Sequence, residues 1–351
     1  FTVEATKGAA LQLSLQGSGS SQATVSGFAI QFSYDGTTWF DYSDANTPLV
    51  PGSLGTGTDK VFVRVNVTSE QETAADGPET FTLNAIMAAG GVTPLSASAE
   101  TTLVDAANGT LYSGNFTSGS PATTTGTLDD DRTLTVTGTT VSENSPYAVF
   151  KISGVAGQDV SLALGNTVST ADRDATLGTD TGNAGTGPLQ ILVNGAWVDY
   201  TAASFVTIPV GGTLLARTQI TNDAVYEGAE TFTLVARNRS AVGFTGITTI
   251  VDDGSSAQVF DSTNTTDTPT TGTADNDKPT LSISDISTSE GGSAVFTAQI
   301  DKQSAYAISF TPSLASGTGT VGTDTAAASS LQVSTDGGVN WSTVSGAVTI
   351  A

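Results

Sequence analysis

The chain has 351 residues, 38% of them hydrophobic, and it carries 34 Asp and Glu against 11 Lys and Arg, a formal net charge of −23. This acidity excludes a nucleic-acid binder, which needs a basic face, and an anionic membrane surface would repel the chain. Two interpretations of the acidity stay open. The surface could simply keep a secreted protein soluble, or some carboxylates could cluster to bind a hard cation.

The sequence contains neither Cys nor His. Disulfides, thiolate metal sites, Cys nucleophiles, His general bases and His-ligated zinc are therefore excluded. No apolar run reaches 18 residues and the first residues do not resemble a signal peptide, so we expect no membrane insertion. Because Phe1 reads as the middle of a strand, we expect a processed or partial chain.

Short stretches rich in Thr and Val, broken by Gly, Asp and Asn, predict strands and turns rather than helices. In chain order, the strands predicted for the middle of the chain cover 133–137, 148–152, 160–164, 189–193, 197–200, 205–208, 214–220, 231–236 and 246–251. Alternation in strand 231–236 predicts that Phe232 and Leu234 face the core while Thr231 and Thr233 face water. The polar stretch 255–275 is predicted to be a long loop or ribbon outside the core.

Four landmarks recur along the chain in one order, which indicates an internal repeat. The first is a Ser-Glu pair followed by Ala-Val-Phe, and its two glutamates, Glu143 and Glu290, are 147 residues apart. The second is Asp or Asn, then Gly, with Trp shortly after, at Asp35, Asn194 and Asp336. The third is Glu-Thr-Phe-Thr-Leu at 79–83 and 230–234, and the fourth is an acidic triplet before a strand, at 129–131 and 275–277.

The Asp-Gly and Asn-Gly pairs predict tight type I′ hairpin turns, which require positive φ angles. The tryptophans that follow, Trp39, Trp197 and Trp341, are expected to anchor the core or the hairpin rather than to form a sugar platform.

The repeat is about 150 residues long, and short strands at this spacing predict Greek-key, Ig-like β-sandwiches in tandem. We therefore predict an all-β fold with three domains: 1–131, a sandwich that lacks its first strand; 132–277, a complete sandwich; and 278–351, the N-terminal part of a third. An incomplete sandwich exposes a sheet edge and part of its core, so either the molecule continues or another chain fills the gap.

The order Ser-Glu, Ala-Val-Phe, Thr-Ala-Asp, Gly-x-Asp, Asn-Asp-x-x-x-Glu-Gly-x-Glu-Thr-Phe and a terminal acidic triplet resembles the Calx-beta domain. The long form with an Asp-Gly-x-x-Trp hairpin, found in tandem in giant bacterial surface proteins and adhesins, is the most similar. The resemblance spans essentially the whole chain and is most specific for 132–277.

In that family calcium is bound by loop carboxylates at one end of the sandwich. The resemblance carries these ligands onto Glu143, Asp172, Asp180, Asp223, Glu227, Asp275, Asn276 and Asp277. Carboxylate and amide oxygens suit Ca²⁺, which takes six to eight of them, and a divalent ion removes the repulsion between neighbouring acids. Solvation without an ion is the alternative for this set.

The flanking copies depart from the pattern. The junction of the first and second copies carries the triplet Asp129, Asp130 and Asp131, for which calcium is also expected. In the third copy Ser316 stands at the position of Asp172, which makes a calcium site there doubtful, although Asp324 and Glu290 persist. Glu79 and Glu230 are interpreted as strand-edge acids.

These features predict a non-enzymatic structural or adhesive repeat of a large bacterial surface protein, extracellular and stiffened by calcium. The main alternative is a segment of a self-assembling surface layer or filament joined by β-strand complementation. A carbohydrate-binding module that uses the tryptophans is a weaker alternative. A glycosidase built on paired carboxylates is disfavoured, because nothing singles out one pair. The expected partners are neighbouring copies or repeats of the protein, with surface glycans as a further class.

Overall fold

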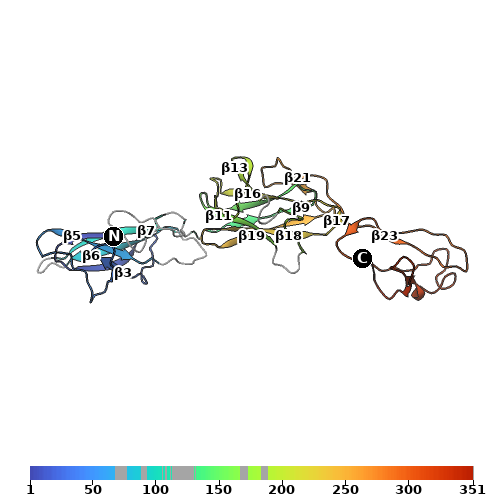
Figure 1. The fold of residues 1–351 in the computed structure, drawn as a ribbon, viewed down its shortest axis with the longest axis horizontal. Coiled ribbons are helices and arrows are strands. Elements are labelled where there is room, and N and C mark those ends of the chain that lie inside the picture. The colour runs from blue at the N-terminus through green and yellow to red at the C-terminus, as the bar shows by residue number, and fades with distance from the viewer. Residues whose placement is uncertain are drawn as a thin grey trace.

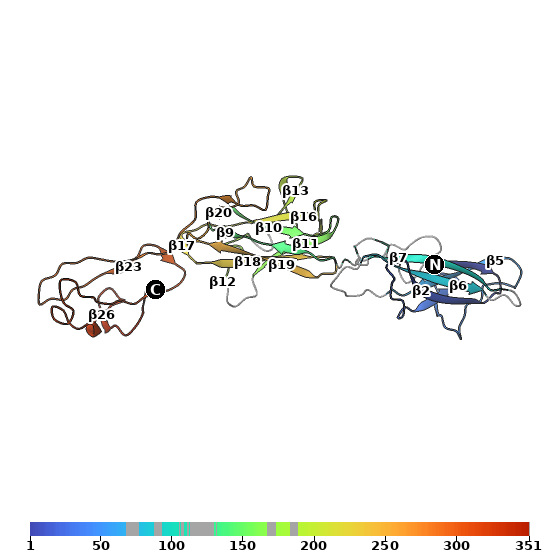
Figure 2. The same cartoon turned by 180° about the vertical axis from the view of Figure 1, so that it is seen from behind.

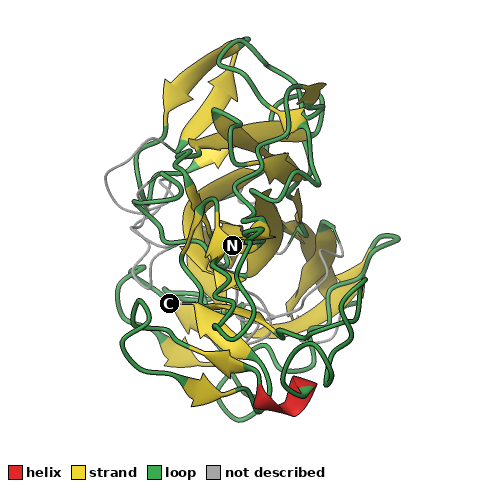
Figure 3. Ribbon diagram, turned by 90° about the vertical axis from the view of Figure 1, so that its right-hand side faces the viewer, coloured by secondary structure: helices red, strands yellow, loops and turns green. Residues whose placement is uncertain are grey.

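The computed structural model describes residues 1–67, 77–87, 93–104, 106, 109–110, 112, 130, 132–166, 173–182 and 189–350. Its strands form three groups that follow one another along the longest axis, here called the first unit (β1–β7), the second unit (β8–β21) and the third unit (β22–β28) (Figure 1). The reverse view shows the same order (Figure 2). Within the described residues the one helical segment is a 3₁₀ turn, Ala328–Ser330, so the predicted all-β fold is confirmed (Figure 3).

The second unit is built from two sheets. The order of the first is β14-β13-β16-β10-β8, with β14 Ala196–Asp199, β13 Gln190–Val193, β16 Thr213–Gln219, β10 Tyr147–Ser153 and β8 Thr135–Thr137. The order of the second is β15-β11-β18-β19-β9, with β15 Val206–Thr207, β11 Asp159–Asn166, β18 Glu230–Arg237, β19 Gly243–Val251 and β9 Thr140–Ser142. A short strand, β12 (Arg173–Asp174), runs parallel to the start of β18. Each of the nine strands predicted for this unit is present, with boundaries shifted by at most three residues.

One hydrophobic core joins the two sheets of the second unit. Phe150 of β10 and Phe232 of β18 meet edge to face with ring centroids 5.6 Å apart, and both side chains are fully buried. Strand β11 shows why the sequence folds this way: Val160, Leu162 and Leu164 alternate into the core along one face. Removing this apolar surface from water is the main driving force for assembling the unit.

Two expectations about burial need correction. Thr233 is buried rather than facing water, because β18 is a central strand and the Thr233 hydroxyl donates to the Asn166 carbonyl at 3.3 Å. The polar stretch after residue 255 does form a ribbon, with β20 (Gln258–Val259) paired to β21 (Thr270–Thr271). However, this ribbon contributes Phe260 to the core, where its backbone N–H donates to Ser145 Oγ at 2.8 Å.

The hairpin turns follow the prediction in one of three cases. Asn194 and Gly195 have φ angles of 51° and 80°, as a type I′ turn requires. The prediction is wrong for Asp35 and Asp336, neither of which has a positive φ. Asp35 Oδ1 instead accepts the backbone N–H groups of Thr37 and Thr38 at 2.8 and 2.7 Å, and Asp336 Oδ1 organises the later loop in the same way.

The first unit repeats much of this plan. Its sheets have the orders β1-β5-β3-β4 and β2-β6-β7, with β1 Thr2–Thr6, β2 Leu11–Ser18, β3 Ile30–Ser33, β4 Phe40–Asp41, β5 Thr58–Val65, β6 Glu79–Met87 and β7 Leu95–Leu103.

The third unit consists of strand pairs, β22 with β23, β25 with β28 and β26 with β27. Its strands are β22 Leu281–Ile283, β23 Ala298–Ile300, β24 Gln303–Ser304, β25 Ile308–Phe310, β26 Gln332–Val333, β27 Ser342–Thr343 and β28 Val348–Ile350. The domain boundaries 131/132 and 277/278 stay a prediction. Within the described residues, no helix has the length and apolar character needed to span a membrane.

Candidate metal centre

Carboxylates gather in two groups in the second unit. The first group is Glu143, Asp275 and Asp277, and the second is Asp180, Glu227 and Glu230. In each group, one carboxylate oxygen from every member lies within 4.8 Å of the corresponding oxygens of the other two. Such distances allow one cation to contact all three side chains.

The first group is assembled by strand β9 and the acidic tail. Strand β9 runs parallel to β19, and the Glu143 N–H extends this ladder by donating to the Val251 carbonyl at 2.9 Å. The acidic tail, residues 275–277, is held against the same strands. The Asp275 N–H donates to Ser142 Oγ at 2.9 Å, and the Asp277 N–H donates to the Asp252 carbonyl at 2.6 Å. Residues more than 130 positions apart in the sequence are thereby brought together.

The second group forms where β18 begins. Glu230 is the first residue of β18, and its neighbour β12 leads directly into the loop that carries Asp180. Asp180 closes this loop on itself, since its Oδ2 accepts the Thr176 N–H at 2.5 Å. The third unit contains a matching loop, in which Asp324 Oδ2 accepts the Thr320 N–H at 2.7 Å.

Asp252, directly after β19, links the two groups. Its Oδ2 accepts the backbone N–H groups of Glu227 and Gly228, at 2.6 and 3.3 Å. Its side chain lies almost out of solvent, with the residue 2% exposed. The charge of Asp252 also raises the pKa values of Glu143, Glu227 and Glu230, which shows that it lies within electrostatic reach of both groups.

The electrostatics of this end of the unit are unfavourable for bare carboxylates. Burial, followed by a hydrogen bond from Asp275 and the charges of nearby acids, raises the pKa of Glu143 to about 9. Burial and the charge of Asp180 raise the pKa of Glu230 to about 8. Burial is also the largest cause of the raised pKa values of Glu227, Asp252 and Asp277.

Several buried oxygens at this end have no hydrogen-bond partner within the described residues. They are Glu143 Oε2, Asp252 Oδ1, Asp275 Oδ2 and Asp277 Oδ2. An unpaired buried carboxylate oxygen is costly, and native proteins rarely leave one without a proton, a donor or a cation. A set of oxygen-only ligands fits a hard divalent cation, so the residues present can hold a metal ion.

The residues expected from the sequence divide into three classes. Glu143, Asp180, Glu227, Asp275 and Asp277 belong to the two groups. Asp223 and Asn276 lie outside them: Asp223 Oδ1 accepts the Val225 N–H at 2.7 Å, although its charge raises the pKa of Glu143, and Asn276 is exposed. Asp172, Asp129 and Asp131 lie outside the described residues.

Two members of this end were not among the expected ligands. Glu230 was interpreted as a strand-edge acid, and Asp252 was not considered. The sequence contains a signal for Asp252, because the pair Val-Asp recurs at 104–105 and at 251–252, at the same place in the repeat. Glu230 and its counterpart Glu79 likewise recur at the start of the same strand.

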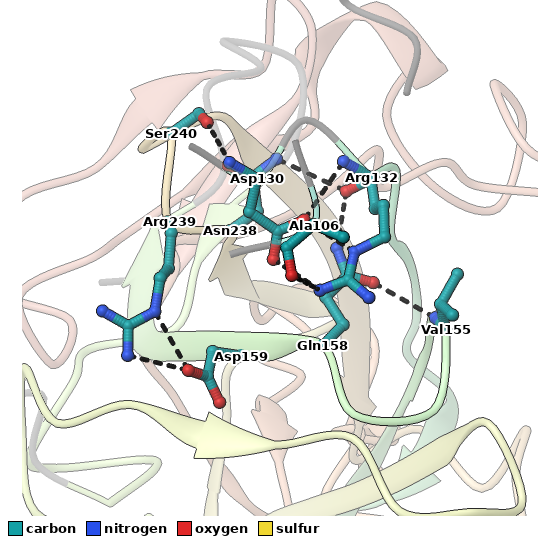
Figure 4. A network of polar contacts seen from close by, with 9 residues as sticks. All are labelled: Ala106, Asp130, Arg132, Val155, Gln158, Asp159, Asn238, Arg239 and Ser240. Atoms are coloured by element: carbon teal, nitrogen blue, oxygen red, sulfur yellow. Dashed lines mark hydrogen bonds and ion pairs between the residues drawn. The ribbon is translucent and has the colours of Figure 1, made fainter. Parts of the chain in front are cut away.

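Asp130 has a guanidinium as its partner. Its two carboxylate oxygens accept from Arg132 Nε at 2.8 Å and from an Arg132 terminal nitrogen at 2.9 Å, in a fully buried position (Figure 4). Arg132 also donates to the Ala106 carbonyl at 3.2 Å, and the Asp130 N–H donates to Ser240 Oγ at 3.0 Å. The structure therefore gives Asp130 an ion pair at the junction of the first and second units, away from both acidic groups.

The joint between the second and third units lies on the same loops. Strand β17 (Val225–Tyr226) runs parallel to β24, and the Ala305 N–H donates to the Tyr226 carbonyl at 2.9 Å. The Arg173 guanidinium stacks 3.3 Å from the centroid of the Tyr306 ring and donates to the Glu227 carbonyl at 3.0 Å. The β17–β24 pairing and the stacking of Arg173 on Tyr306 join loops beside the acidic groups to the third unit. The hydrogen bond from Arg173 to the Glu227 carbonyl supports one of these loops.

Lys302 of the third unit faces the tail. Its ammonium group donates to the Asn276 carbonyl and lies 3.6 Å from Asp277 Oδ1.

No protein-family model matches the chain, and no curated protein sequence matches it. Among solved structures, the chain is similar to a crystal structure of a tetra-tandem repeat in the extending region of a large adhesion protein, at 13% sequence identity and a TM-score of 0.23. The match covers 80% of this chain and 52% of that one. The Calx-beta resemblance therefore remains one of sequence motifs.

Proposed function

We propose that this chain is a non-enzymatic, calcium-binding structural module of an extracellular bacterial surface or adhesive protein. The observation that carries the proposal is the set of buried, unpartnered carboxylate oxygens on Glu143, Asp252, Asp275 and Asp277. Without a cation, these oxygens must take up protons or repel one another.

Calcium suits the two acidic groups of the second unit better than other common biological metals do. The ligand atoms are carboxylate oxygens supplied by loops and by the start of β18, and Ca²⁺ accepts six to eight oxygens in irregular geometry. Mg²⁺ demands near-octahedral geometry and keeps several waters, so it fits a crowded cluster of carboxylates less well. Zinc and copper prefer nitrogen and sulfur ligands, and the sequence has no His or Cys.

Stiffening follows from the position of the acidic groups. Glu227 directly follows β17, which pairs with β24 of the third unit, and Asp277 lies beside Lys302. An ion that fixes these carboxylates would also fix the loops that hold the third unit. Loss of the ion would free both contacts together, and the angle between the units would vary more.

The non-enzymatic and extracellular parts of the proposal rest on the sequence. The acids recur with the repeat rather than forming one selected pair, and a net charge of −23 without Cys or His suits an exported bacterial repeat protein. Neighbouring repeats or copies of the protein are the proposed partners. Hydrolysis of any polysaccharide by the purified chain would contradict this part.

Isothermal titration of the chelator-treated chain with CaCl₂ tests the proposal. We expect saturable binding with one or two ions per chain at the two acidic groups, and weaker binding of Mg²⁺ under the same conditions. The control is Glu100→Gln, which removes one exposed negative charge from β7 of the first unit. Failure of calcium to bind, or equal loss of binding in the control, would contradict the proposal.

A further inference from the structure

The chain enters the second unit through Arg132, whose backbone is held by two buried amide side chains. The Arg132 carbonyl accepts from Gln158 Nε2 at 2.6 Å and from Asn238 Nδ2 at 3.4 Å (Figure 4). Gln158 is 0% exposed and Asn238 is 1% exposed. Each amide is oriented from its other end, because Gln158 Oε1 accepts the Val155 N–H at 3.1 Å and Asn238 Oδ1 accepts a backbone N–H at 3.0 Å. Arg132 is therefore a fixed point of the second unit.

The guanidinium of Arg132 connects this fixed point to the end of the first unit. It pairs with both oxygens of the buried Asp130 carboxylate and donates to the carbonyl of Ala106, just beyond the end of β7. Asp130 also forms an antiparallel bridge with Ala106, and its N–H donates to Ser240 of the second unit. These contacts form the joint between the first and second units, here called the first joint. A paired contact between two planar groups fixes their relative orientation, which a single contact does not.

The joint between the second and third units, here called the second joint, cannot form this ion pair. A shift of 146 residues places Asn276 at the position of Asp130, and the same shift places Lys278 at that of Arg132. The structure agrees with this correspondence, because Asn276 forms an antiparallel bridge with Asp253 as Asp130 does at the first joint. The amide of Asn276 carries no charge, and a lysine offers a point charge instead of the planar fork of an arginine.

The second joint is held by other contacts. Ser304 of β24 stands 146 residues after Gln158, and its hydroxyl donates to the Tyr226 carbonyl of the second unit at 3.4 Å. The position that fixes the entering chain in the second unit therefore contacts β17 in the third. Glu227, a member of the second acidic group, directly follows β17. The second joint is thus built beside clustered carboxylates, whereas the first joint is built around a guanidinium.

We propose that the Arg132 guanidinium is a permanent cation of the first joint, which holds the first and second units at one angle whether or not calcium is bound. A guanidinium keeps its charge at all ordinary pH values, and because it belongs to the chain a chelator does not remove it. This statement does not depend on the proposed calcium function. Its consequence does rest on that function: when calcium is lost, the chain bends at the second joint while the first joint stays fixed.

The test is the spread of distances across the first joint in the full chain. Leu54→Cys and Val210→Cys, at positions that are 74% and 97% exposed, place one spin label in each unit of a chain that has no Cys. Pulsed electron spin resonance should give a narrow distance distribution of the same width in calcium and in chelator. Lys151→Gln, which removes a positive charge from an exposed ion pair of the second unit, is the control and should leave this width unchanged.

Removal of the ion pair should abolish the narrow distribution in both conditions. Arg132→Ala alone leaves a buried carboxylate without its guanidinium and destabilises the fold, so the principal variant is Asp130→Ala with Arg132→Ala, which removes both charges. The hydrogen bonds of the Arg132 carbonyl do not involve either side chain and are kept, and thermal unfolding checks that the double variant is folded. Its distribution should be broad with and without calcium.

Three results would overturn the proposal: broadening of the Leu54–Val210 distribution of the unmodified chain in chelator, a broad distribution in both conditions, or a narrow distribution in the folded double variant. The proposed calcium function fails separately. Labels at Val210 and Val339, which span the second joint, would then give equal widths with and without calcium while the Leu54–Val210 result still supports the role of Arg132.

Discussion

The Asp252 carboxylate accepts the backbone N–H of Glu227 at 2.6 Å, and this bond joins two structural features. Asp252 directly follows the long strand β19, and Glu227 directly follows the short strand β17, which pairs with the third unit. The acidic end and the inter-unit joint therefore share one backbone contact. A change in the charge of the Asp252 carboxylate is therefore expected to alter the contact between the second and third units.

Replacing one buried ligand should separate ion binding from folding. Glu143→Gln is expected to lower calcium affinity at least about tenfold, since a missing ligand costs at least as much as a disturbed supporting residue. In chelator the same variant should unfold at an equal or higher temperature, because a neutral amide replaces a buried carboxyl among other acids. Calorimetric titration and thermal unfolding measure the two effects, and Glu100→Gln should change neither. A Glu143→Gln variant with unchanged calcium affinity would place the ion elsewhere.

When calcium is removed, the free energy of unfolding should fall as pH rises. The pKa of Glu143 is raised to about 9 and that of Glu230 to about 8, whereas both carboxyls titrate near 4.5 in the unfolded chain. Between these values the folded state binds more protons, so the free energy of unfolding falls as pH rises. In chelator, the unfolding temperature is expected to be lower at pH 8 than at pH 5.5.

Calcium should remove this decline, because the ion binds the deprotonated carboxylates and stabilises the folded state most at high pH. The Glu143→Gln, Glu230→Gln double variant should show a flatter pH profile in chelator than the unmodified chain. An unfolding temperature that rises from pH 5.5 to pH 8 in chelator would contradict the interpretation of buried, repelling acids.

Lys302 is predicted to compete with calcium. Its ammonium group lies 3.6 Å from Asp277 Oδ1 and supplies part of the positive charge that an ion would otherwise provide. Lys302→Gln should therefore raise calcium affinity about two- to fivefold, as expected for a partly exposed ion pair. Lys60→Gln, in β5 of the first unit, is the control for the loss of one positive charge. An affinity reduced by Lys302→Gln would mean that the lysine supports the site rather than competing for it.

Phe260 should contribute to stability like a core residue, although it lies in a polar ribbon. Phe260→Ala is expected to lower the free energy of unfolding by about 3–5 kcal/mol, because it empties a fully buried position. Denaturant unfolding checks the value. Asp267→Asn in the same ribbon removes only an exposed ion pair with Lys151 and should cost at most about 1 kcal/mol. A small effect of Phe260→Ala would mean that the ribbon is detached in solution.

The sequence predicted the strands well because alternation and turn residues are local signals. Strand β11 illustrates this, with Val160, Leu162 and Leu164 pointing into the core. Burial of Thr233 and Phe260 could not be predicted in this way, because it depends on which strands become central and on where a distant ribbon folds back. Local residue patterns carry no information on such non-local contacts.

The candidate site was predicted in part for a similar reason. Glu143 and Asp275 stand in recurrent motifs of the repeat, and the Calx-beta resemblance pointed to Glu227. Asp252 is part of the site because its side chain accepts the backbone N–H of Glu227, a contact between distant loops, whereas Asp130 pairs with the neighbouring Arg132. Which acids share a site is decided by the packing of loops, and the order of motifs does not specify it.

The most direct test of calcium stiffening measures the spread of distances between the second and third units. The chain has no Cys, so Val210→Cys and Val339→Cys, at two highly exposed positions, allow spin labels to be attached at these sites alone. Pulsed electron spin resonance should give a narrow distance distribution in calcium and a clearly broader one in chelator, and Arg173→Ala should broaden the distribution in calcium. Distributions of equal width with and without calcium would contradict the account.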